Sequence, residues 1–492
     1  MPVVLRAAAF ADLSRTASVP AYDPKSITAG ILHFGVGNFH RAHQAVYLDD
    51  LFNRGLDHDW GIVGAGVRDA DAAMRDKLMG QYLLTTVVEQ EAAQSSARVT
   101  ASLVEFLKPG DTHAIINRLA DPAIRIVSLT VTEGGYYIDP ASQRFDPKHP
   151  DIVHDAAHFD TPKTVFGLIL AGLKRRRDIG IAPFTVMSCD NIPGNGHVAH
   201  NAVVGLARLI YPELAAWVEA NVAFPSSMVD RITPATTDRE RSLLAADFGI
   251  TDAWPVFCER FRQWVLEDNF PAGRPALEQV GVQFVPDVAP YELMKIRILN
   301  GGHATIAYPA ALMDIHFVHE AMENDLIRGF LAKLEREEII PVVPPVPDTD
   351  LGDYYRLIET RFANPRIADT ITRLCHDGSN RQPKFILPSV RDRLSLGQDV
   401  PGLALVGALW ARYCYGVTDS GQPIAPNDPD WPRLSLEAAR AKDDPHHWLE
   451  MTDIFGEIAT HKKYENSFTR ALNSLHAHGT RETLTRYLAG TL

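Results

Sequence analysis

The alternation of short apolar runs with helical patterns is the strongest constraint on how the first 200 residues fold. Apolar runs occupy residues 31–34, 60–67, 124–132 and 184–188, and each stops at glycine or at polar side chains. Amphipathic stretches separate them, for example at 163–176. Buried strands that alternate with helices are typical of βαβ units, whose strands pair in parallel. This part of the chain is therefore predicted to be α/β, with a parallel sheet.

Beyond about residue 285 the apolar residues recur at helical spacing. A four-residue step along one helical face connects Val318, Met322, Leu326, Phe330 and Leu334. Similar patterns occupy 354–362, 403–414 and 480–488, and the loops expected between helices include 341–347 and 418–430. A chain of 492 residues is too long for one ordinary domain. We therefore predict two domains, at 1–285 and at 286–492, the second mainly α-helical.

Composition excludes several classes of partner. The 48 basic and 61 acidic residues give a net charge of −13, spread without a long run of one sign. Such a surface argues against nucleic acid or anionic lipid as a partner, and no run of about 18 apolar residues predicts a membrane span. The four cysteines are scattered, which fits a reducing compartment, and the N-terminus does not resemble a signal peptide. A cytoplasmic protein is expected, as a monomer or a small homo-oligomer.

A glycine turn follows the first apolar run. Gly35 and Gly37 stand between that run and a helical pattern, where glycines let the backbone approach a pyrophosphate. His40 occupies the position at which the usual fingerprint has a third small residue. A plain tight turn is the alternative interpretation.

Acidic residues follow the second apolar run, at the place where the ribose of NAD would lie. Asp69 and Asp71 are the candidates, with surface carboxylates as the alternative. A negative charge there would repel the 2′-phosphate of NADP, which favours NAD as the cofactor. NADP stays possible, because the neighbouring Arg68 could accommodate that phosphate.

The segment at 291–303 carries an unusual polar helical face. At roughly 100° per residue, an arc of about 140° contains Glu292, Lys295, Asn300 and His303. Removal of hydride from an alcohol needs a base and hydrogen-bond donors for the oxygen, and a lysine with a lowered pKa can be such a base. Gly301 and Gly302 indicate either a close backbone approach or a helix end. An exposed lysine with a helix-ending asparagine is the alternative.

Several motifs together resemble the polyol-specific long-chain dehydrogenases, most closely the mannitol 2-dehydrogenase type. They are GVGNFHRAH (35–43), TVTEGGYY (130–137), FTVMSCDNIPGNG (184–196), FPSSMVDRITP (224–234), YELMKIRILNGGH (291–303) and DGSNRQPKF (377–385). The resemblance implies a Rossmann-type N-terminal domain that binds NAD, a helical substrate domain, and a cleft between the two. It also implies reversible oxidation of a sugar alcohol, as in D-mannitol to D-fructose.

The resemblance also implies roles for individual residues. Lys295 would be the general base, and Asn191 and Asn300 would hold the reacting oxygen. Substrate hydroxyls would be contacted by His303, Asp230, Arg373, Arg381 and Lys384, and the proton would leave past Glu133 and Glu292. The cofactor would be bound by Gly35, Gly37, Phe39, Arg68, Asp69 and Asp71.

Two positions depart from the family pattern. Arg381 stands where the mannitol enzymes usually have lysine, and it presents a wider planar group to the substrate. After the second strand the family typically has a Glu-Asp pair, whereas here Ala70 precedes Asp71. Asp71 matches the retained acid, and Asp69 would compensate for the missing glutamate. The related activities of D-arabinitol 4-dehydrogenase and fructuronate reductase therefore stay open, and the arginines would suit the carboxylate of a uronate.

Other kinds of chemistry are less well supported by the sequence. The spacing of His316, His319 and Glu320 matches no standard zinc motif, so no metal is expected. His40 and His43 are interpreted as polar residues at a helix start, and none of the cysteines is a candidate nucleophile. A non-catalytic NAD-binding sensor would not need the residues at 291–303.

Overall fold

The computed structural model describes residues 2–139 and 144–492, and the chain divides into two compact units. The first unit comprises residues 1–289 and the second comprises 290–492. The sequence pattern places the boundary between 285 and 286, in the segment that joins the last strand of the first unit to the first helix of the second.

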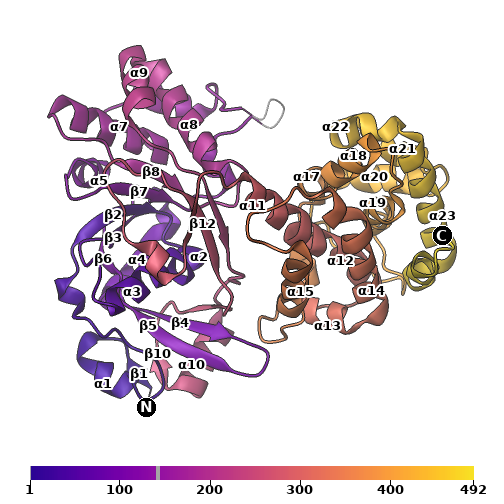
Figure 1. Ribbon diagram of the computed structural model, residues 1–492, viewed down its shortest axis with the longest axis horizontal. Coiled ribbons are helices and arrows are strands. Elements are labelled where there is room, and N and C mark those ends of the chain that lie inside the picture. Colours follow the sequence, from indigo (N-terminus) through magenta and orange to yellow (C-terminus); the bar gives the residue numbers. More distant parts are fainter. Residues whose placement is uncertain (1, 140–143) are drawn as a thin grey trace. The chain divides into compact units, whose positions relative to one another are not determined.

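A five-stranded parallel sheet forms the centre of the first unit (Figure 1). Its order is β6-β3-β2-β7-β8, and the strands are β2 (Ala29–Phe34), β3 (Gly61–Ala65), β6 (Leu103–Phe106), β7 (Ile126–Leu129) and β8 (Thr185–Ser188). The strand order reverses between β2 and β7, and ligands of doubly wound folds bind at the carboxyl ends of strands at such a point. The predicted parallel sheet is confirmed.

Both faces of this sheet are buried by helices. Leu32 and Phe34 of β2 pack in one core with α5 (Thr112–Leu119), α7 (Val165–Asp178) and α8 (Asn195–Ile210). Ile31 points to the other face and packs in a second core with α3 (Gln44–Asn53). The strand side chains are apolar on both faces, as is typical of a buried parallel sheet.

Smaller sheets and helices complete the first unit. One sheet has the order β11-β4-β5 (Val256–Glu259, Thr85–Gln90, Ser95–Thr100) and another the order β13-β12-β9 (Gln283–Val285, Gln263–Glu267, Ser227–Asp230). The short strands β1 (Val3–Val4) and β10 (Ile250–Thr251) pair with each other. The remaining α-helices are α1 (Phe10–Leu13), α2 (Asn38–Ala42), α4 (Asp69–Gly80), α6 (Pro150–Ala157), α9 (Pro212–Asn221) and α10 (Asp238–Phe248).

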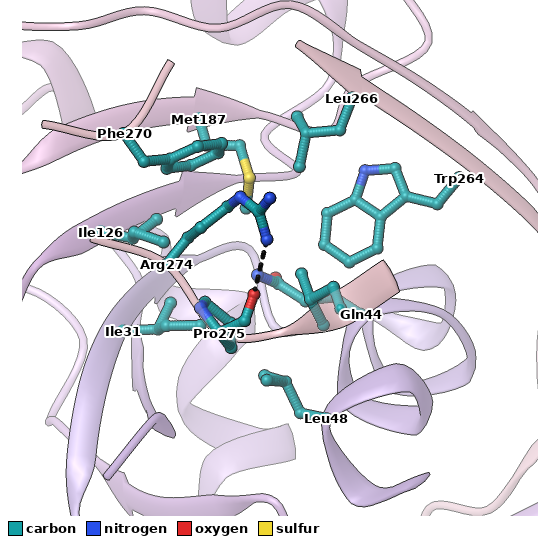
Figure 2. A pocket seen from close by; sticks show the side chains of 11 residues that line it. Ile31, Gln44, Leu48, Ile126, Met187, Trp264, Leu266, Phe270, Arg274 and Pro275 are labelled. Carbon is teal, nitrogen blue, oxygen red and sulfur yellow. Dashed lines mark hydrogen bonds between the residues drawn. The ribbon is translucent and has the colours of Figure 1, made fainter. Parts of the chain in front are cut away.

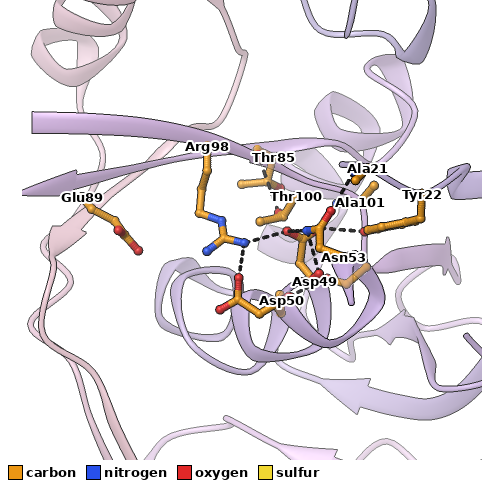
Figure 3. Close-up of polar contacts among 12 residues, drawn as sticks. Ala21, Tyr22, Asp49, Asp50, Asn53, Thr85, Glu89, Arg98, Thr100 and Ala101 are labelled. Atoms are coloured by element: carbon orange, nitrogen blue, oxygen red, sulfur yellow. Dashed lines mark hydrogen bonds and ion pairs between the residues drawn. The ribbon is translucent and has the colours of Figure 1, made fainter. Parts of the chain in front are cut away.

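A buried carboxylate ties β5 to α3. Figure 3 shows Arg98 reaching Asp49 and Asp50, with Nη2 at 2.8 Å and 2.5 Å from their carboxylate oxygens. The hydroxyl of Tyr22 donates to Asp49 at 2.6 Å. Asp49 is almost fully buried, and these donors replace the water that its charge would otherwise need.

The second unit is helical, as predicted, and residues 290–492 contain no strand. α11 (Ala289–Met294) leads into a π-helical turn (Lys295–Asn300), which continues into α12 (Gly301–Leu312). The longer helices that follow are α14 (Asp325–Leu334), α15 (Leu351–Phe362), α19 (Pro401–Cys414), α20 (Trp431–Ala441) and α23 (Lys462–Ala489). The shorter ones are α13 (Val318–Glu323), α16 (Ile371–Cys375), α17 (Gly378–Phe385), α18 (Leu387–Ser395), α21 (His446–Leu449) and α22 (Thr452–Phe455).

The helical face predicted from Val318 to Leu334 is divided in the structure. α13 ends at Glu323 and α14 begins at Asp325, because Asn324 has extended backbone and caps the second helix. Its side-chain oxygen accepts from the N–H groups of Leu326 and Ile327 at 3.1 Å and 3.3 Å. The apolar step continues across this break because both helices pack on the same core.

Over the described residues, no helix is both long enough and apolar enough to cross a membrane.

Candidate active site

The glycine turn lies at the point where the strand order reverses. Gly35 has φ of +95°, and a Cβ on it would lie 2.0 Å from the carbonyl oxygen of Thr130, at the end of β7. The hydroxyl of Thr130 donates to the Gly35 carbonyl at 2.7 Å. A Cβ on Gly37 would meet no atom closer than 3.8 Å, so this residue faces open space. The turn is therefore closed against the sheet on one side and open on the other, which fits the approach of a dinucleotide pyrophosphate.

His40 fills the place of the third small residue by turning into the core. Its ring stacks on that of His33 of β2, with centroids 3.6 Å apart and planes 13° apart. His33 is hydrogen-bonded to Ser128 at 2.7 Å and to Thr130 at 3.0 Å. Both rings are fully buried, and burial lowers the pKa of His33 to about 3 and that of His40 well below its ordinary value. Two neutral imidazoles thus pack α2 against the sheet.

The two candidate acids after β3 have different environments. Asp69 is exposed at the first position of α4. Asp71 is buried, and its carboxylate accepts from the backbone N–H of Arg68 at 3.3 Å and from its guanidinium at 3.2 Å. The structure thus leaves Asp69 available to a ribose, whereas Asp71 closes the first turn of the helix. Phe39 is half-buried and stacks on His43 at 4.9 Å.

Three further candidates follow strands of the first unit. Glu133 and Asn191 are exposed after β7 and β8, and Asp230 is the last residue of β9 and is buried. Asn195 connects the segment after β8 to the start of β9, since its amide donates to the Asp190 carbonyl at 2.9 Å and to the Ser227 carbonyl at 2.8 Å.

The polar helix of the second unit contains a π-turn that the sequence pattern did not predict. Lys295 and Asn300 are its first and last residues, and both are buried. In an α-helix, residues five apart are rotated by about 140° from each other. The i→i+5 hydrogen bonding of a π-turn brings such residues toward the same side, and π-turns are frequent at functional sites. The predicted α-helical arc is therefore wrong, and Lys295 and Asn300 are more nearly aligned than it implied.

Gly301 and Gly302 do not mark a helix end. Both lie inside the continuous helix that runs on to Leu312. A Cβ on Gly301 would lie 3.4 Å from the carbonyl oxygen of Phe385, and one on Gly302 would lie 3.4 Å from the ring of Phe362. Of the two alternatives that the sequence left open, the structure excludes the helix end, and a Cβ at either position would make only ordinary van der Waals contacts.

His303 lies in a positively charged environment. Its ring stacks on Phe362 at 4.1 Å. Burial, and then the charges of Arg373, Arg381 and Arg361, lower the pKa of His303 well below its ordinary value. Within the described residues, neither Nε2 of His303 nor the side-chain oxygen of Asn300 has a hydrogen-bond partner. These buried atoms are thus suited to a polar ligand.

The two candidate arginines are held by local contacts. Arg373 is exposed and forms a two-point ion pair with Asp369, whose carboxylate accepts from Nε at 2.6 Å and also from Nη2. Arg381 donates to the carbonyl of Leu374 at 2.8 Å, at the end of α16. Lys384 is exposed on α17. Sequence reasoning missed Arg361, Phe362 and Asp369, of which only Asp369 could have been found, from its i, i+4 spacing to Arg373.

Residues considered for other chemistry are placed elsewhere. No group of three or more His, Cys, Asp or Glu side chains in the described parts of the chain could hold a metal ion. Glu320 accepts from the backbone N–H groups of His316 and Phe317 at the start of α13. All four cysteines are buried thiols, and burial raises the pKa of Cys189, Cys258 and Cys375 to about 12.

Figure 2 shows a cavity in the first unit that is lined mainly by apolar side chains such as Ile126, Met187 and Trp264. None of the predicted site residues lines it.

Comparison with known proteins identifies the family. The mannitol dehydrogenase Rossmann domain matches residues 29–279, and the mannitol dehydrogenase C-terminal domain matches 287–476. A mannitol 2-dehydrogenase of Cereibacter sphaeroides is 60% identical over 97% of this chain and all of the relative. One of Neosartorya fischeri is 40% identical over 96% of this chain and 95% of the relative. The chain belongs to the mannitol dehydrogenase family.

Two solved structures of similar proteins agree with this. One is the mannitol 2-dehydrogenase of Pseudomonas fluorescens in ternary complex with NAD and D-mannitol, which has a TM-score of 0.90 and 43% sequence identity. The match covers 99% of this chain and the whole of that chain. A substrate-free D-sorbitol dehydrogenase also has a TM-score of 0.90, with 33% identity, and covers 98% of this chain and all of its own. The predicted family and the predicted Rossmann-plus-helical fold are confirmed. In this mannitol dehydrogenase family member, the glycine turn belongs to the Rossmann match and the π-turn to the C-terminal match.

Proposed function

We propose that the protein is an NAD-dependent polyol dehydrogenase that interconverts D-mannitol and D-fructose, as a mannitol 2-dehydrogenase. The observation that carries this proposal is the buried π-turn with Lys295 and Asn300, in a chain of the mannitol dehydrogenase family. A sensor of NAD would need the first unit only, so the polar residues of the second unit support an enzyme. The cytoplasm, proposed as its compartment, suits the four buried thiols.

NAD fits the first unit. The open side of the turn at Gly37 and the exposed carboxylate of Asp69 support contacts with a pyrophosphate and with ribose hydroxyls. When bound, NAD⁺ supplies the acceptor for the hydride of the carbinol carbon. We propose that Gly35, Gly37, Phe39, Arg68 and Asp69 form the cofactor site and that Asp71 supports it by holding Arg68.

Lys295 is proposed as the general base that takes the proton of the reacting hydroxyl. A lysine does this near neutral pH only when its ammonium is destabilised, and Lys295 is buried. The amides of Asn191 and Asn300 would donate to the oxygen as its negative charge develops. Glu133 and Glu292 would then pass the proton to water. This chemistry assigns no step to a metal.

The remaining hydroxyls of the polyol are assigned to His303, Asp230, Arg373, Arg381 and Lys384. Burial among cations keeps His303 neutral, so its Nε2 can exchange a hydrogen bond with a hydroxyl in either direction. Because Arg373 and Arg381 are already held by Asp369 and by the Leu374 carbonyl, they present fixed donors.

A second candidate is reduction of a hexuronate such as fructuronate. The cations around His303 favour it, since a carboxylate binds well to a guanidinium. The Asp369 carboxylate partly neutralises this charge, which favours the neutral sugar. D-Arabinitol, a shorter neutral polyol, would use the same donors.

A panel of substrates tests the proposal. Initial rates are measured for D-mannitol, D-arabinitol, D-fructose and fructuronate, each with NAD(H) and with NADP(H). We expect D-mannitol and D-fructose with NAD(H) to give the highest kcat/KM. Inactivity on every neutral polyol and ketose, with turnover of fructuronate, would replace the proposal by the second candidate. Lys295→Ala should abolish turnover while NADH binding, measured by fluorescence, is retained.

A further inference from the structure

A strained turn follows β7 in the first unit. Thr132 has φ of +67° and ψ of 166°, and the short 3-10 helix Glu133–Tyr136 comes directly after it. Tyr137, at the end of that helix, has φ of +54°. A positive φ is unfavourable for a β-branched residue such as threonine, and it persists only where surrounding contacts impose it.

The carboxylate of Asp190 accepts three hydrogen bonds from this turn. One oxygen accepts from the N–H of Thr132 at 2.8 Å, and the other accepts from the N–H of Val131 at 2.9 Å and from the hydroxyl of Tyr136 at 2.7 Å. Asp190 is 7% exposed and Tyr136 is fully buried. Hydrogen bonds that a buried carboxylate accepts are strong.

The backbone of Asp190 is held as firmly as its side chain. Its N–H donates to the Ser188 hydroxyl at 3.3 Å, and its carbonyl accepts from the amide of Asn195 at 2.9 Å. The next residue is Asn191, and the turn that the carboxylate grips carries Glu133. One buried residue thus precedes Asn191 in the chain and is hydrogen-bonded to the residue before Glu133.

We propose that Asp190 is a positioning residue, which fixes the Glu133 turn through its carboxylate and directs Asn191 through its backbone. This inference rests on the proposed function for the roles of Asn191 and Glu133. The hydrogen bonds described above support it, because they fix both segments to the same buried group.

Asp190→Asn tests the inference with little change in shape. In the variant, the side-chain amide nitrogen would face a backbone N–H group that now donates to the carboxylate. Two donors would then face each other, so the turn should loosen. We expect kcat for D-mannitol to fall on the order of 100-fold, as misplaced catalytic groups do, with a small change in the KM for NAD. Hydrogen exchange of the Val131 and Thr132 amides should become faster.

A double-mutant cycle separates positioning from a general loss of stability. If Asp190 acts through its neighbours, Asp190→Asn should cause little further loss of kcat in a chain that already carries Asn191→Ala and Glu133→Gln. If Asp190→Asn lowered kcat by the same factor in the wild type and in the chain with Asn191→Ala and Glu133→Gln, the inference would be overturned. Should Asp190→Asn fail to fold, Tyr136→Phe removes one of the three donors and is put through the same cycle.

Asp155→Asn is the matched control. Asp155 is fully buried and accepts from two consecutive N–H groups, of Lys163 and Thr164, and from the Thr164 hydroxyl, at 2.7 Å to 2.9 Å. The variant Asp155→Asn should lower the Tm, as Asp190→Asn does, but it should leave kcat nearly unchanged. A wild-type protein without polyol turnover would refute the proposed function, whereas unchanged exchange at Val131 and Thr132 in Asp190→Asn would refute the inference.

Discussion

His40 shows at the scale of a residue how a fingerprint position can be filled by an unexpected side chain. A buried imidazole with a depressed pKa stays neutral in the folded protein, but it takes up a proton below about pH 6.5 when the chain unfolds. Its contribution to stability is thus complete above pH 6.5 and is lost as the pH falls, at about 1.4 kcal/mol per pH unit.

His40→Phe should therefore flatten the acid side of the stability profile. Phenylalanine keeps a ring to stack on His33 and removes two ring nitrogens that have no partner within the described residues. Urea unfolding between pH 7 and pH 4 should show a slope smaller by about 1.4 kcal/mol per pH unit than in the wild type. His446→Gln, at an exposed histidine, is the control with an unchanged slope. A slope equal to that of the wild type in His40→Phe would mean that His40 is protonated in the folded protein.

Asp69 and Asp71 allow a second prediction for single residues. Asp69→Asn should lower the preference for NAD over NADP by about tenfold, or ~1.4 kcal/mol, because an exposed charge that repels the 2′-phosphate is removed. Asp71→Asn should act mainly on stability, since its carboxylate binds Arg68. The ratio of kcat/KM for the two cofactors and the urea midpoint measure these effects. If Asp71→Asn changed the NAD-to-NADP ratio of kcat/KM more than Asp69→Asn did, Asp71 and not Asp69 would be the residue that selects the cofactor.

Which residue types occupy the candidate site could be predicted from the sequence, but their local contacts could not. The pattern after the second strand named Asp71 and the family resemblance named Arg373, but neither revealed that Arg68 and Asp369 engage them. Such pairs depend on rotamers and on how much water reaches each group. His40 was likewise identified as an exception to the fingerprint, whereas its burial depends on β2, which lies beside it only in the folded chain.

At the scale of elements, apolar periodicity predicted the helices well and their interruptions poorly. The four-residue step between Val318 and Leu334 hides the break at Asn324, because both helices bury the same face. The π-turn at Lys295 was missed for a related reason, since a fixed 100° per residue assumes one type of helix. Predicting either feature requires knowledge of the backbone hydrogen bonds.

The cap at Asn324 gives a prediction for an element. Asn324→Ala should lower the free energy of unfolding by about 1 kcal/mol, because the N–H groups of Leu326 and Ile327 lose their side-chain acceptor. Asn324→Asp keeps an acceptor at this position and should retain most of the stability. Urea unfolding of both variants checks this, and equal losses in the two would argue that the amide nitrogen and not the oxygen matters.

At the scale of the whole molecule, the fold class was predictable because it depends on patterns within short segments. The order β6-β3-β2-β7-β8 was not, since it depends on pairing between strands far apart in the chain, such as β2 with β7. Only the family resemblance implied a Rossmann arrangement. That arrangement explains why the glycine turn, Glu133 and Asn191 all follow the carboxyl ends of strands in one sheet.

The division into two units predicts how the molecule unfolds. Each unit has many fully buried apolar side chains of its own, so calorimetry should resolve two transitions and not a single two-state one. NADH at 100 times its Kd should stabilise its binding unit by about 2.7 kcal/mol. NADH should shift the transition of the first unit, which is also the transition that His40→Phe changes at pH 5. Asn324→Ala should shift the transition of the second unit. If both variants moved a single common transition equally, the two units would unfold as one cooperative body.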